Sequence, residues 1–157
     1  MGLSCTKAEH DNIEPREYKR KNSTSERVTH VTIYDRWNLE GTKEFINKLK
    51  PYLKEDDIVV TIENTYRQTF VSKKQPLIVL CWHYSRIDTD IRYSLEHIDS
   101  AKHKSLIVIL LHWKKDDKER NATSRAADSS LMFIDAFAQK DKDNIKVVAE
   151  EIKKRCS

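Results

Sequence analysis

The chain has 157 residues, enough for one domain, and its net charge of only +4 argues against a dedicated nucleic-acid binder, which usually has a strongly basic face. Gly2 and Gly41 are its only glycines, which excludes the glycine-rich loops that bind nucleotide phosphates or dinucleotide cofactors. Three cysteines lie far apart without a CxxC pair, so we expect an intracellular, reduced protein with no disulfide framework and no structural zinc.

The first residues, Met-Gly-Leu-Ser-Cys-Thr, match the pattern for N-terminal myristoylation. Removal of Met1 would expose Gly2 as the acceptor of the fatty acid, and Thr6 supplies the hydroxyl residue of the pattern. One myristoyl chain binds a membrane only marginally, so stable anchoring needs a second signal, which palmitate on Cys5 would supply. The sequence therefore predicts lipid anchoring through Gly2 and Cys5 at the cytoplasmic face of a membrane. The alternative is a Met-Gly start that is not acylated.

A change of composition near Val28 marks the expected boundary between a tether and a domain. Residues 1–27 are mostly polar and of mixed charge, and they are expected to form a lipid-modified, flexible tether. Residues 28–157 are expected to form a single α/β domain. Its first strand is predicted from Val28, through alternating apolar residues, to Tyr34-Asp35.

A helix and a second strand are predicted next. Apolar residues recur at helical spacing from Leu39 to Leu53, which predicts a helix with Thr42 as its N-cap. Pro51 should distort the last turn of this helix because proline removes a backbone donor. A short apolar run then predicts a strand at 58–62.

The clearest unit consists of two continuous apolar strands, predicted at 77–82 and 106–111, with a helix between them. Strands without a polar face are typical of sheets that are covered on both sides. The helix is expected from Ser85 to Asp99, with Ser85 and Asp88 as a capping box at its start. A strand, a helix and a strand of this length form a crossover that is almost always right-handed.

Two short segments fit more than one structure. Residues 65–72 predict a short strand or a loop, and residues 131–134 predict a strand or the start of a helix. A long polar loop is expected at 114–130 and a final helix at 144–155. The alternation of strands and helices predicts a Rossmann-like or flavodoxin-like three-layer α/β sandwich, with a mostly parallel sheet of four or five strands.

Polar and aromatic side chains gather where the predicted strands end. Ligands of open parallel sheets bind beyond the carboxyl ends of the strands, so these positions are the candidate ligand-binding set: Asp35, His83, Ser85, Arg86 and His112. All three tryptophans, Trp37, Trp82 and Trp113, fall at the same edge. These rings either shield the end of the sheet or line a binding cleft.

The candidate catalytic residues are Asp90, Asp88 and His83. Arg86 would bind a phosphate at the start of the helix, whereas Asp88 and Asp90 would repel it and suit a ribose hydroxyl or the helix dipole. His83 and His112 are predicted to face each other across adjacent strands. With Asp35 they would form a metal site, but no ligand spacing on one element supports it, and we expect no metal.

The segment from Pro76 to Trp113, with Ser-Arg-x-x-Thr-Asp-Ile between two apolar strands, resembles a group of small fish proteins, some of them linked to virus or interferon induction. This resemblance covers about half of the chain, and it implies an innate-immune context without implying an activity. The layout is also similar to that of TIR and nucleoside deoxyribosyltransferase-like domains. The deoxyribosyltransferases carry a catalytic Glu on the helix after a comparable strand, where Asp88 or Asp90 lies here, with Glu96 two turns further on.

The expected function is a membrane-tethered, non-catalytic module for signalling or innate immunity. It would present the edge of the sheet and the 114–130 loop to a protein partner at the inner leaflet. The alternative is an enzyme that binds nucleosides or nucleotides or cleaves an N-glycosidic bond, with Asp90 as nucleophile or base and Arg86 on the phosphate. No cofactor is expected, because the loop after the first strand is not rich in the Ser, Thr and Gly residues that would wrap a flavin phosphate.

Overall fold

The structure is a computed structural model that describes residues 28–67, 75–103, 105–113, 131–138 and 142–156. Its elements in chain order are β1 (Thr29–Tyr34), α1 (Glu40–Lys54), β2 (Ile58–Glu63), β3 (Leu77–Trp82), α3 (Ile87–Ser94), the short 3₁₀ helix η1 (Ser100–Lys102), β4 (Leu106–His112), β5 (Met132–Phe137) and α4 (Lys142–Cys156).

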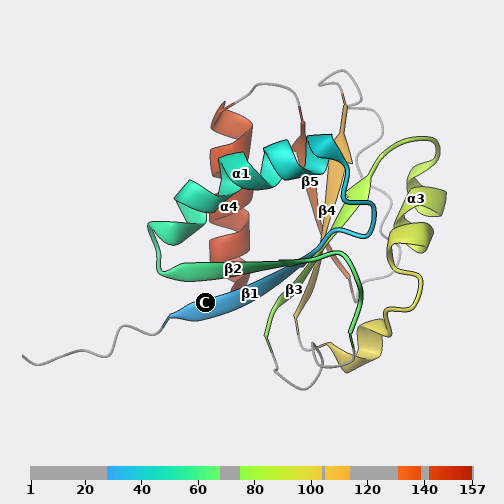
Figure 1. Cartoon of the computed structure of the whole chain (residues 1–157), viewed down its shortest axis with the longest axis horizontal. Coiled ribbons are helices and arrows are strands. Elements are labelled where there is room, and N and C mark those ends of the chain that lie inside the picture. Colours follow the sequence, from blue (N-terminus) through green and yellow to red (C-terminus); the bar gives the residue numbers. More distant parts are fainter. Residues whose placement is uncertain (1–27, 68–74, 104, 114–130, 139–141, 157) are drawn as a thin grey trace, which may run out of the picture.

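The five strands form one sheet in the order β2-β1-β3-β4-β5, and every neighbouring pair is parallel. The predicted α/β sandwich is therefore confirmed, with five strands (Figure 1). This order is the flavodoxin-like one, in which the direction of strand addition reverses between β1 and β3. The loops that follow β1 and β3 consequently diverge to opposite faces of the sheet and leave space for a ligand between them.

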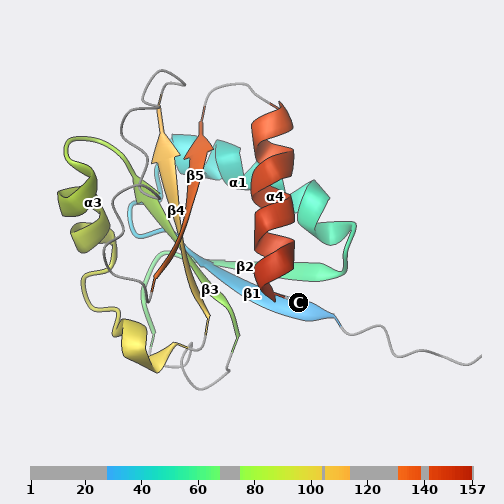
Figure 2. The same ribbon diagram turned by 180° about the vertical axis from the view of Figure 1, so that it is seen from behind.

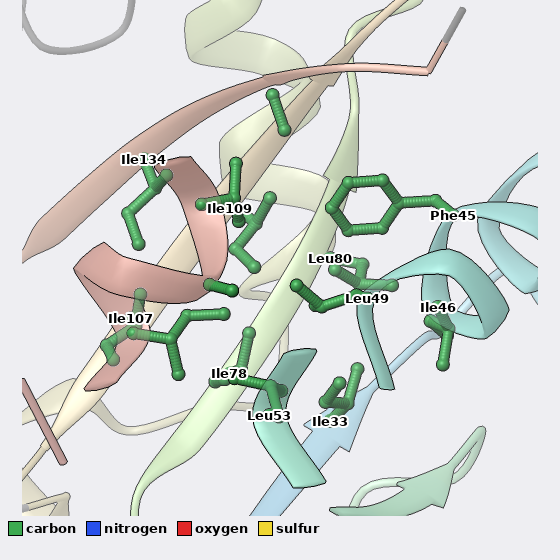
Figure 3. Close-up of a cluster of buried hydrophobic side chains, with 14 of the residues drawn as sticks. Ile33, Phe45, Ile46, Leu49, Leu53, Ile78, Leu80, Ile107, Ile109 and Ile134 are labelled. Carbon is green, nitrogen blue, oxygen red and sulfur yellow. The ribbon is translucent and has the colours of Figure 1, made fainter. Parts of the chain in front are cut away.

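The main core lies between the sheet and two helices. Helices α1 and α4 cover one face of the sheet together, whereas α3 lies on the other face (Figures 1 and 2). Phe45, Leu49 and Leu53 of α1 pack on strand residues such as Ile78 and Ile109, and all of these side chains are buried (Figure 3). Every residue of β4 is buried, because the strand has neighbours on both edges and cover on both faces. This explains why its sequence is continuously apolar.

Both predicted helix caps are wrong. Helix α1 begins at Glu40, its N-cap position is Leu39, and Thr42 lies inside the first turn. Helix α3 covers only Ile87–Ser94, and its N-cap position, Arg86, makes no capping hydrogen bond with its side chain. The carboxylates that organise these two helix starts come from other positions of the chain, described below.

The remaining predictions on secondary structure divide between described and undescribed parts of the chain. Residues 131–134 fall mostly in a strand, β5, and the start of a helix is excluded there. Helix α1 continues through Pro51 to Lys54, and its last turn is closed by the Glu55 N–H, which donates to the Pro51 carbonyl at 3.3 Å. The 114–130 loop, the 1–27 tether and most of the 65–72 segment lie outside the described residues. No described helix is long and apolar enough to cross a membrane.

Candidate functional site

Aromatic side chains line two adjoining hollows at the carboxyl edge of the sheet. One has a volume of about 300 Å³ and is lined by Trp37, Leu39, Trp82, Tyr84, Asp90 and Tyr93. The other has about 520 Å³ and is lined by Leu39, Gly41, Trp82, His83, Tyr84 and Trp113. Because the two hollows share Leu39, Trp82 and Tyr84, we treat them as one feature and call it the aromatic cleft. It lies at the β1/β3 switch point, where the fold favours ligand binding.

The aromatic cleft is unusually exposed for a set of large apolar side chains. Tyr84 is 88% exposed, Tyr93 53%, Trp37 50%, Trp113 50% and Leu39 43%. These are five of the nine large apolar residues that are exposed in the described part of the chain. A gathering of exposed apolar groups of this kind is typical of a surface that binds another molecule.

The floor of the aromatic cleft is fixed by a close approach between α1 and Trp82. A methyl group added at Gly41 would lie 2.8 Å from Cη2 of Trp82, so only glycine allows the indole to pack this close to the helix. Trp82 also packs against Trp113, with ring centroids 5.8 Å apart and planes tilted by 58°. The two rings therefore support each other where β3 and β4 end.

Asp35 shapes the loop that presents Trp37 and Leu39. Its side chain is buried, one carboxylate oxygen accepts the Asn38 N–H at 3.0 Å, and the other accepts the Thr42 hydroxyl. Asn38 has a positive φ of 48°, which asparagine tolerates better than most residues. Ligand binding by Asp35 stays a prediction; in the structure each of its oxygens accepts a hydrogen bond inside the loop, which stabilises the loop.

Asp90 closes the turn between β3 and α3. One of its oxygens accepts the backbone N–H groups of Tyr84 and Ser85, both at 2.9 Å, and the other accepts the Ser85 hydroxyl at 3.2 Å. This pattern replaces the predicted capping box of Ser85 and Asp88. It also weakens the prediction of Asp90 as a nucleophile or base, because its lone pairs are engaged by donors. Arg86 and Asp88 lie beside this turn, and both residues are exposed.

Arg36 ties the loop after β1 to the end of α3. Its guanidinium forms an ion pair with Glu96 at 2.7 Å and donates to the backbone carbonyl of Tyr93, and it lies 5.5 Å above the Trp37 ring. The hydrogen bond from Arg36 lowers the pKa of Glu96. Glu96 is thus a structural partner of Arg36, and together they hold Tyr93 and Trp37 as walls of the same cleft.

A chain of three ionisable side chains runs along the ends of β3, β4 and β5. Nδ1 of His83 lies 3.1 Å from Nδ1 of His112, and Nε2 of His112 lies 2.8 Å from Oδ1 of Asp135. His112 is completely buried, and Phe137 stacks on its ring at a centroid distance of 5.2 Å. The prediction that the two histidines face each other is confirmed, but the carboxylate beside them is Asp135 and not Asp35.

The register of the sheet explains this arrangement. The His83 N–H donates to the Leu111 carbonyl at 2.9 Å, which sets His83 beside the end of β4. Strand β5 pairs with β4 so that Leu110 is opposite Asp135, and His112 is opposite Phe137. Sequence reasoning missed Asp135. Its only sequence signal is a charged residue within an otherwise apolar segment, which usually indicates a partner.

Which ring nitrogens donate in these two contacts depends on the tautomers of the histidines. We assign the Nε2 proton of His112 to the bond with Asp135, because a carboxylate only accepts. With its proton on Nε2 alone, His112 offers Nδ1 as an acceptor in the contact with His83.

No metal site is formed by the described residues, among which no group of three His, Cys, Asp or Glu side chains could hold an ion. Cys81 is unsuited to nucleophilic chemistry as well, because burial raises its pKa to about 12. Gly2 and Cys5, the predicted lipid acceptors, lie outside the described residues. A scan against protein-family models gives no match, and no curated protein matches the sequence significantly.

Proposed function

We propose that the protein is a membrane-tethered recognition module that binds a protein partner through the aromatic cleft. The observation that carries this proposal is the concentration of exposed Trp and Tyr rings at one edge of the sheet. Tryptophan and tyrosine are the residues most often responsible for binding energy in protein interfaces. Signalling or innate immunity is the context that we propose for this recognition.

Rigidity of the aromatic cleft supports a binding role. The Asp35 loop, the Asp90 turn and the Arg36–Glu96 ion pair hold its walls before any partner arrives. A surface that is already ordered loses less conformational entropy on association, which favours affinity. The same contacts leave no described acidic residue near the cleft with the features of a dedicated nucleophile, so recognition is favoured over covalent catalysis.

The membrane half of the proposal rests on the Met-Gly-Leu-Ser-Cys-Thr start. We propose that myristate on Gly2 and palmitate on Cys5 hold the domain at the cytoplasmic face of a membrane. Two acyl chains are needed because one gives only marginal and reversible binding. Tethering would raise the local concentration of the aromatic cleft for partners at the same membrane.

Metabolic labelling with an alkyne analogue of myristate tests the anchor. The wild-type protein should be labelled and found in the membrane fraction, and Gly2→Ala should lose both the label and the membrane association. Cys5→Ser should keep the myristate label but move largely to the soluble fraction. Unlabelled wild type, or full labelling of Gly2→Ala, would disprove the anchor.

Proximity labelling from the full-length protein in cells tests the aromatic cleft. Proteins that bind the aromatic cleft should be labelled by the wild type and should no longer be labelled by the double variant Trp37→Ala/Tyr93→Ala. They should be retained in Val147→Ala, which removes an equally exposed apolar side chain from α4. Identical neighbours for all three proteins would rule out the aromatic cleft as the recognition surface.

Small-molecule binding is the second candidate function. It is favoured by one specific observation: the smaller hollow, of about 300 Å³, lies between aromatic walls at the β1/β3 switch point. We propose a nucleoside-like ligand here, because flat rings stack on Trp and Tyr faces. A thermal-shift screen of nucleosides, nucleotides and NAD tests it, and no stabilisation by any compound would count against this function.

A further inference from the structure

We propose that a hollow between α1, the end of β5 and the start of α4 binds the myristoyl chain on Gly2 and keeps it out of water when the protein is away from a membrane. We call this feature the α1–α4 hollow. The inference rests on the lipid anchor of the proposed function, because it needs an acylated Gly2. It goes further by giving the acyl chain a site on the domain, and thereby a means to control membrane association.

The α1–α4 hollow is large enough for an acyl chain, and most of its described lining is apolar. Its volume is about 530 Å³, within the range of about 300 to 1,000 Å³ that is usual for pockets that bind small molecules. A methylene group takes up about as much space as a water molecule, about 30 Å³, so a fourteen-carbon chain needs about 400 Å³. The apolar lining residues are Pro51, Tyr52, Phe137, Ala138 and Ile145.

The α1–α4 hollow borders the main core. Ile145 is buried in that core, and Tyr52 is partly buried and packs against it. The wall formed by Phe137 is held in place, because its N–H donates to the Asn144 side chain at 3.0 Å and its ring stacks on His112. An acyl chain bound here would therefore extend an apolar core that is already formed.

The charged residues of the lining suit an acyl chain without a carboxylate. Lys48 and Lys142 line the α1–α4 hollow, but so does Glu55, and Lys48 forms an ion pair with Glu44 at 2.6 Å. Both lysines are exposed, and lysine side chains can cover an apolar chain with their methylene groups while their ammonium groups stay in water. A myristoyl chain in amide linkage carries no charge, so it fits this mixed lining better than a free fatty acid does.

The chain enters the domain beside the α1–α4 hollow. The Thr29 N–H donates to the Asp57 carbonyl at 3.1 Å, and Asp57 lies two residues after the lining residue Glu55, no more than about 7.6 Å away along the backbone. Lys153 of α4 forms an ion pair with Asp56 in the same turn. The start of β1 therefore lies next to the ends of both helices that form the hollow (Figures 1 and 2).

The length of chain before β1 is sufficient for Gly2 to reach this site. Residues 2–27 span at most about 86 Å, several times the radius of gyration of about 14 Å that is expected for a domain of residues 28–157. A ligand that is linked to its own site acts at an effective concentration of about a millimolar. Weak intrinsic affinity of the α1–α4 hollow for the acyl chain is therefore enough.

A site on the domain explains how the protein could remain in water with one acyl chain. Myristate alone binds a membrane only marginally, so a protein with myristate but without palmitate is found partly in water. Its methylene groups are unfavourable there, and burial between α1 and α4 removes them from water. We expect the chain to stay in the α1–α4 hollow until palmitate on Cys5 holds the protein at the membrane.

Nuclear Overhauser effects from carbon-13-labelled myristate test the site directly. The full-length protein is produced in bacteria together with an N-myristoyltransferase, and mass spectrometry establishes whether it is acylated. In the absence of lipid, the labelled chain should contact the side chains of Ile145, Tyr52 and Phe137. An acyl chain without contacts to the domain, or with contacts to Trp37 and Tyr93 of the aromatic cleft instead, would overturn the inference.

Filling the α1–α4 hollow should release the chain. Ala138→Trp adds a large side chain at a partly buried lining position, and Ala101→Trp is the matched control at an exposed position in η1. Myristoylated Ala138→Trp should bind vesicles of phosphatidylcholine and phosphatidylserine at least about tenfold more tightly than the wild type, because a bound chain lowers the apparent affinity by the fraction that is free. Ala101→Trp should bind like the wild type.

Unchanged vesicle binding by Ala138→Trp would contradict the inference. The same substitution in a Gly2→Ala background should have no effect on vesicle binding, since no acyl chain is present there to release. Tighter binding in that background as well would show that the added tryptophan itself contacts lipid, and would remove this support for the α1–α4 hollow.

The outcomes separate this inference from the anchor on which it rests. A chain that the transferase does not acylate would overturn both. An acylated protein that binds vesicles through Gly2, but whose acyl chain stays out of the α1–α4 hollow, would overturn this inference and leave the anchor intact. A fatty acid that co-purifies in equimolar amount with the Gly2→Ala protein and occupies the hollow would assign the site to a free lipid instead.

Discussion

Asp35 and Asp90 each close a turn at the carboxyl edge of the sheet. Asp35 binds the Asn38 N–H and the Thr42 hydroxyl, and Asp90 binds two backbone N–H groups and the Ser85 hydroxyl. Short polar side chains often complete turns in this way, because they satisfy donors that no strand or helix uses. Two carboxylates therefore hold the turns that form the aromatic cleft, and one of them, Asp90, also lines the smaller hollow.

Another single residue, His103, makes stability depend on pH. Its Nε2 lies 2.9 Å from the Tyr66 hydroxyl, and burial lowers its pKa from the usual 6.5, against a smaller opposing effect of Asp99. The folded protein thus binds a proton on His103 less readily than the unfolded chain does. The resulting stabilisation is fully present above pH 6.5, the unfolded value, and is lost as the pH falls through the folded pKa.

His103→Gln should therefore make stability less sensitive to acid. Glutamine can keep a hydrogen bond to Tyr66 but does not titrate, so the variant should lose less unfolding free energy than the wild type between neutral pH and pH of about 5. Urea denaturation at the two pH values measures this difference. The matched control is His97→Asn, at an exposed histidine, which should behave like the wild type. A steeper loss in His103→Gln would contradict the prediction.

At the scale of elements, strands are the part of this fold that the sequence predicts best. The unbroken apolar runs of β3 and β4 are only six or seven residues long and rich in β-branched residues, which favours buried parallel strands over a buried helix. Helix starts are predicted poorly. Ser85 and Thr42 have the right chemistry for caps, but their hydroxyls donate to the carboxylates of Asp90 and Asp35 instead of capping a helix. Asp135 could not be assigned at all, because its partner His112 comes from another strand, and pairing of β4 with β5 is a property of the sheet.

The contact between α1 and Trp82 leads to a prediction for Gly41→Ala. Alanine favours a helix over glycine by about 1 kcal/mol, but its methyl group would lie 2.8 Å from Cη2 and 3.2 Å from Cζ3 of Trp82, so the indole must move. We expect the free energy of unfolding to change by no more than about 1 kcal/mol, since the two effects oppose each other. The indole N–H signal of Trp82 should shift in NMR spectra.

Lys43→Ala is the control for this change, because it alters an exposed side chain in the same turn of α1. It should leave the Trp82 signal unchanged. If Gly41→Ala also left that signal in place, the close packing of Trp82 on the helix would not exist in solution. Ligand or partner binding measured on the same variant would then show whether the floor of the aromatic cleft matters for recognition.

At the scale of the whole molecule, the strand order creates the site. Residues far apart in the chain meet because β1 lies beside β3, and β3, β4 and β5 end next to one another. The pairing of β1 with β3 brings the loop of Trp37 toward Tyr93. The adjoining ends of β3, β4 and β5 bring His83, His112 and Asp135 together. Sequence patterns give the strands but not their order, so they predict that polar and aromatic residues share an edge. Among the contacts at that edge, the sequence predicted the one between His83 and His112 but not the one between His112 and Asp135.

The last prediction at this scale is that the domain folds without residues 1–27. Every described strand and helix lies at or after Thr29, and the buried core is drawn from those elements. The polar composition of residues 1–27 predicts a tether that does not add to this core, so a variant that starts at Val28 should fold with a Tm within about 2 °C of the unacylated full-length protein. It should keep the near-UV circular dichroism of the tryptophans but lose membrane association. A drop in Tm of many degrees would show instead that residues 1–27 pack on the domain, and that the N-terminal segment is a part of the fold.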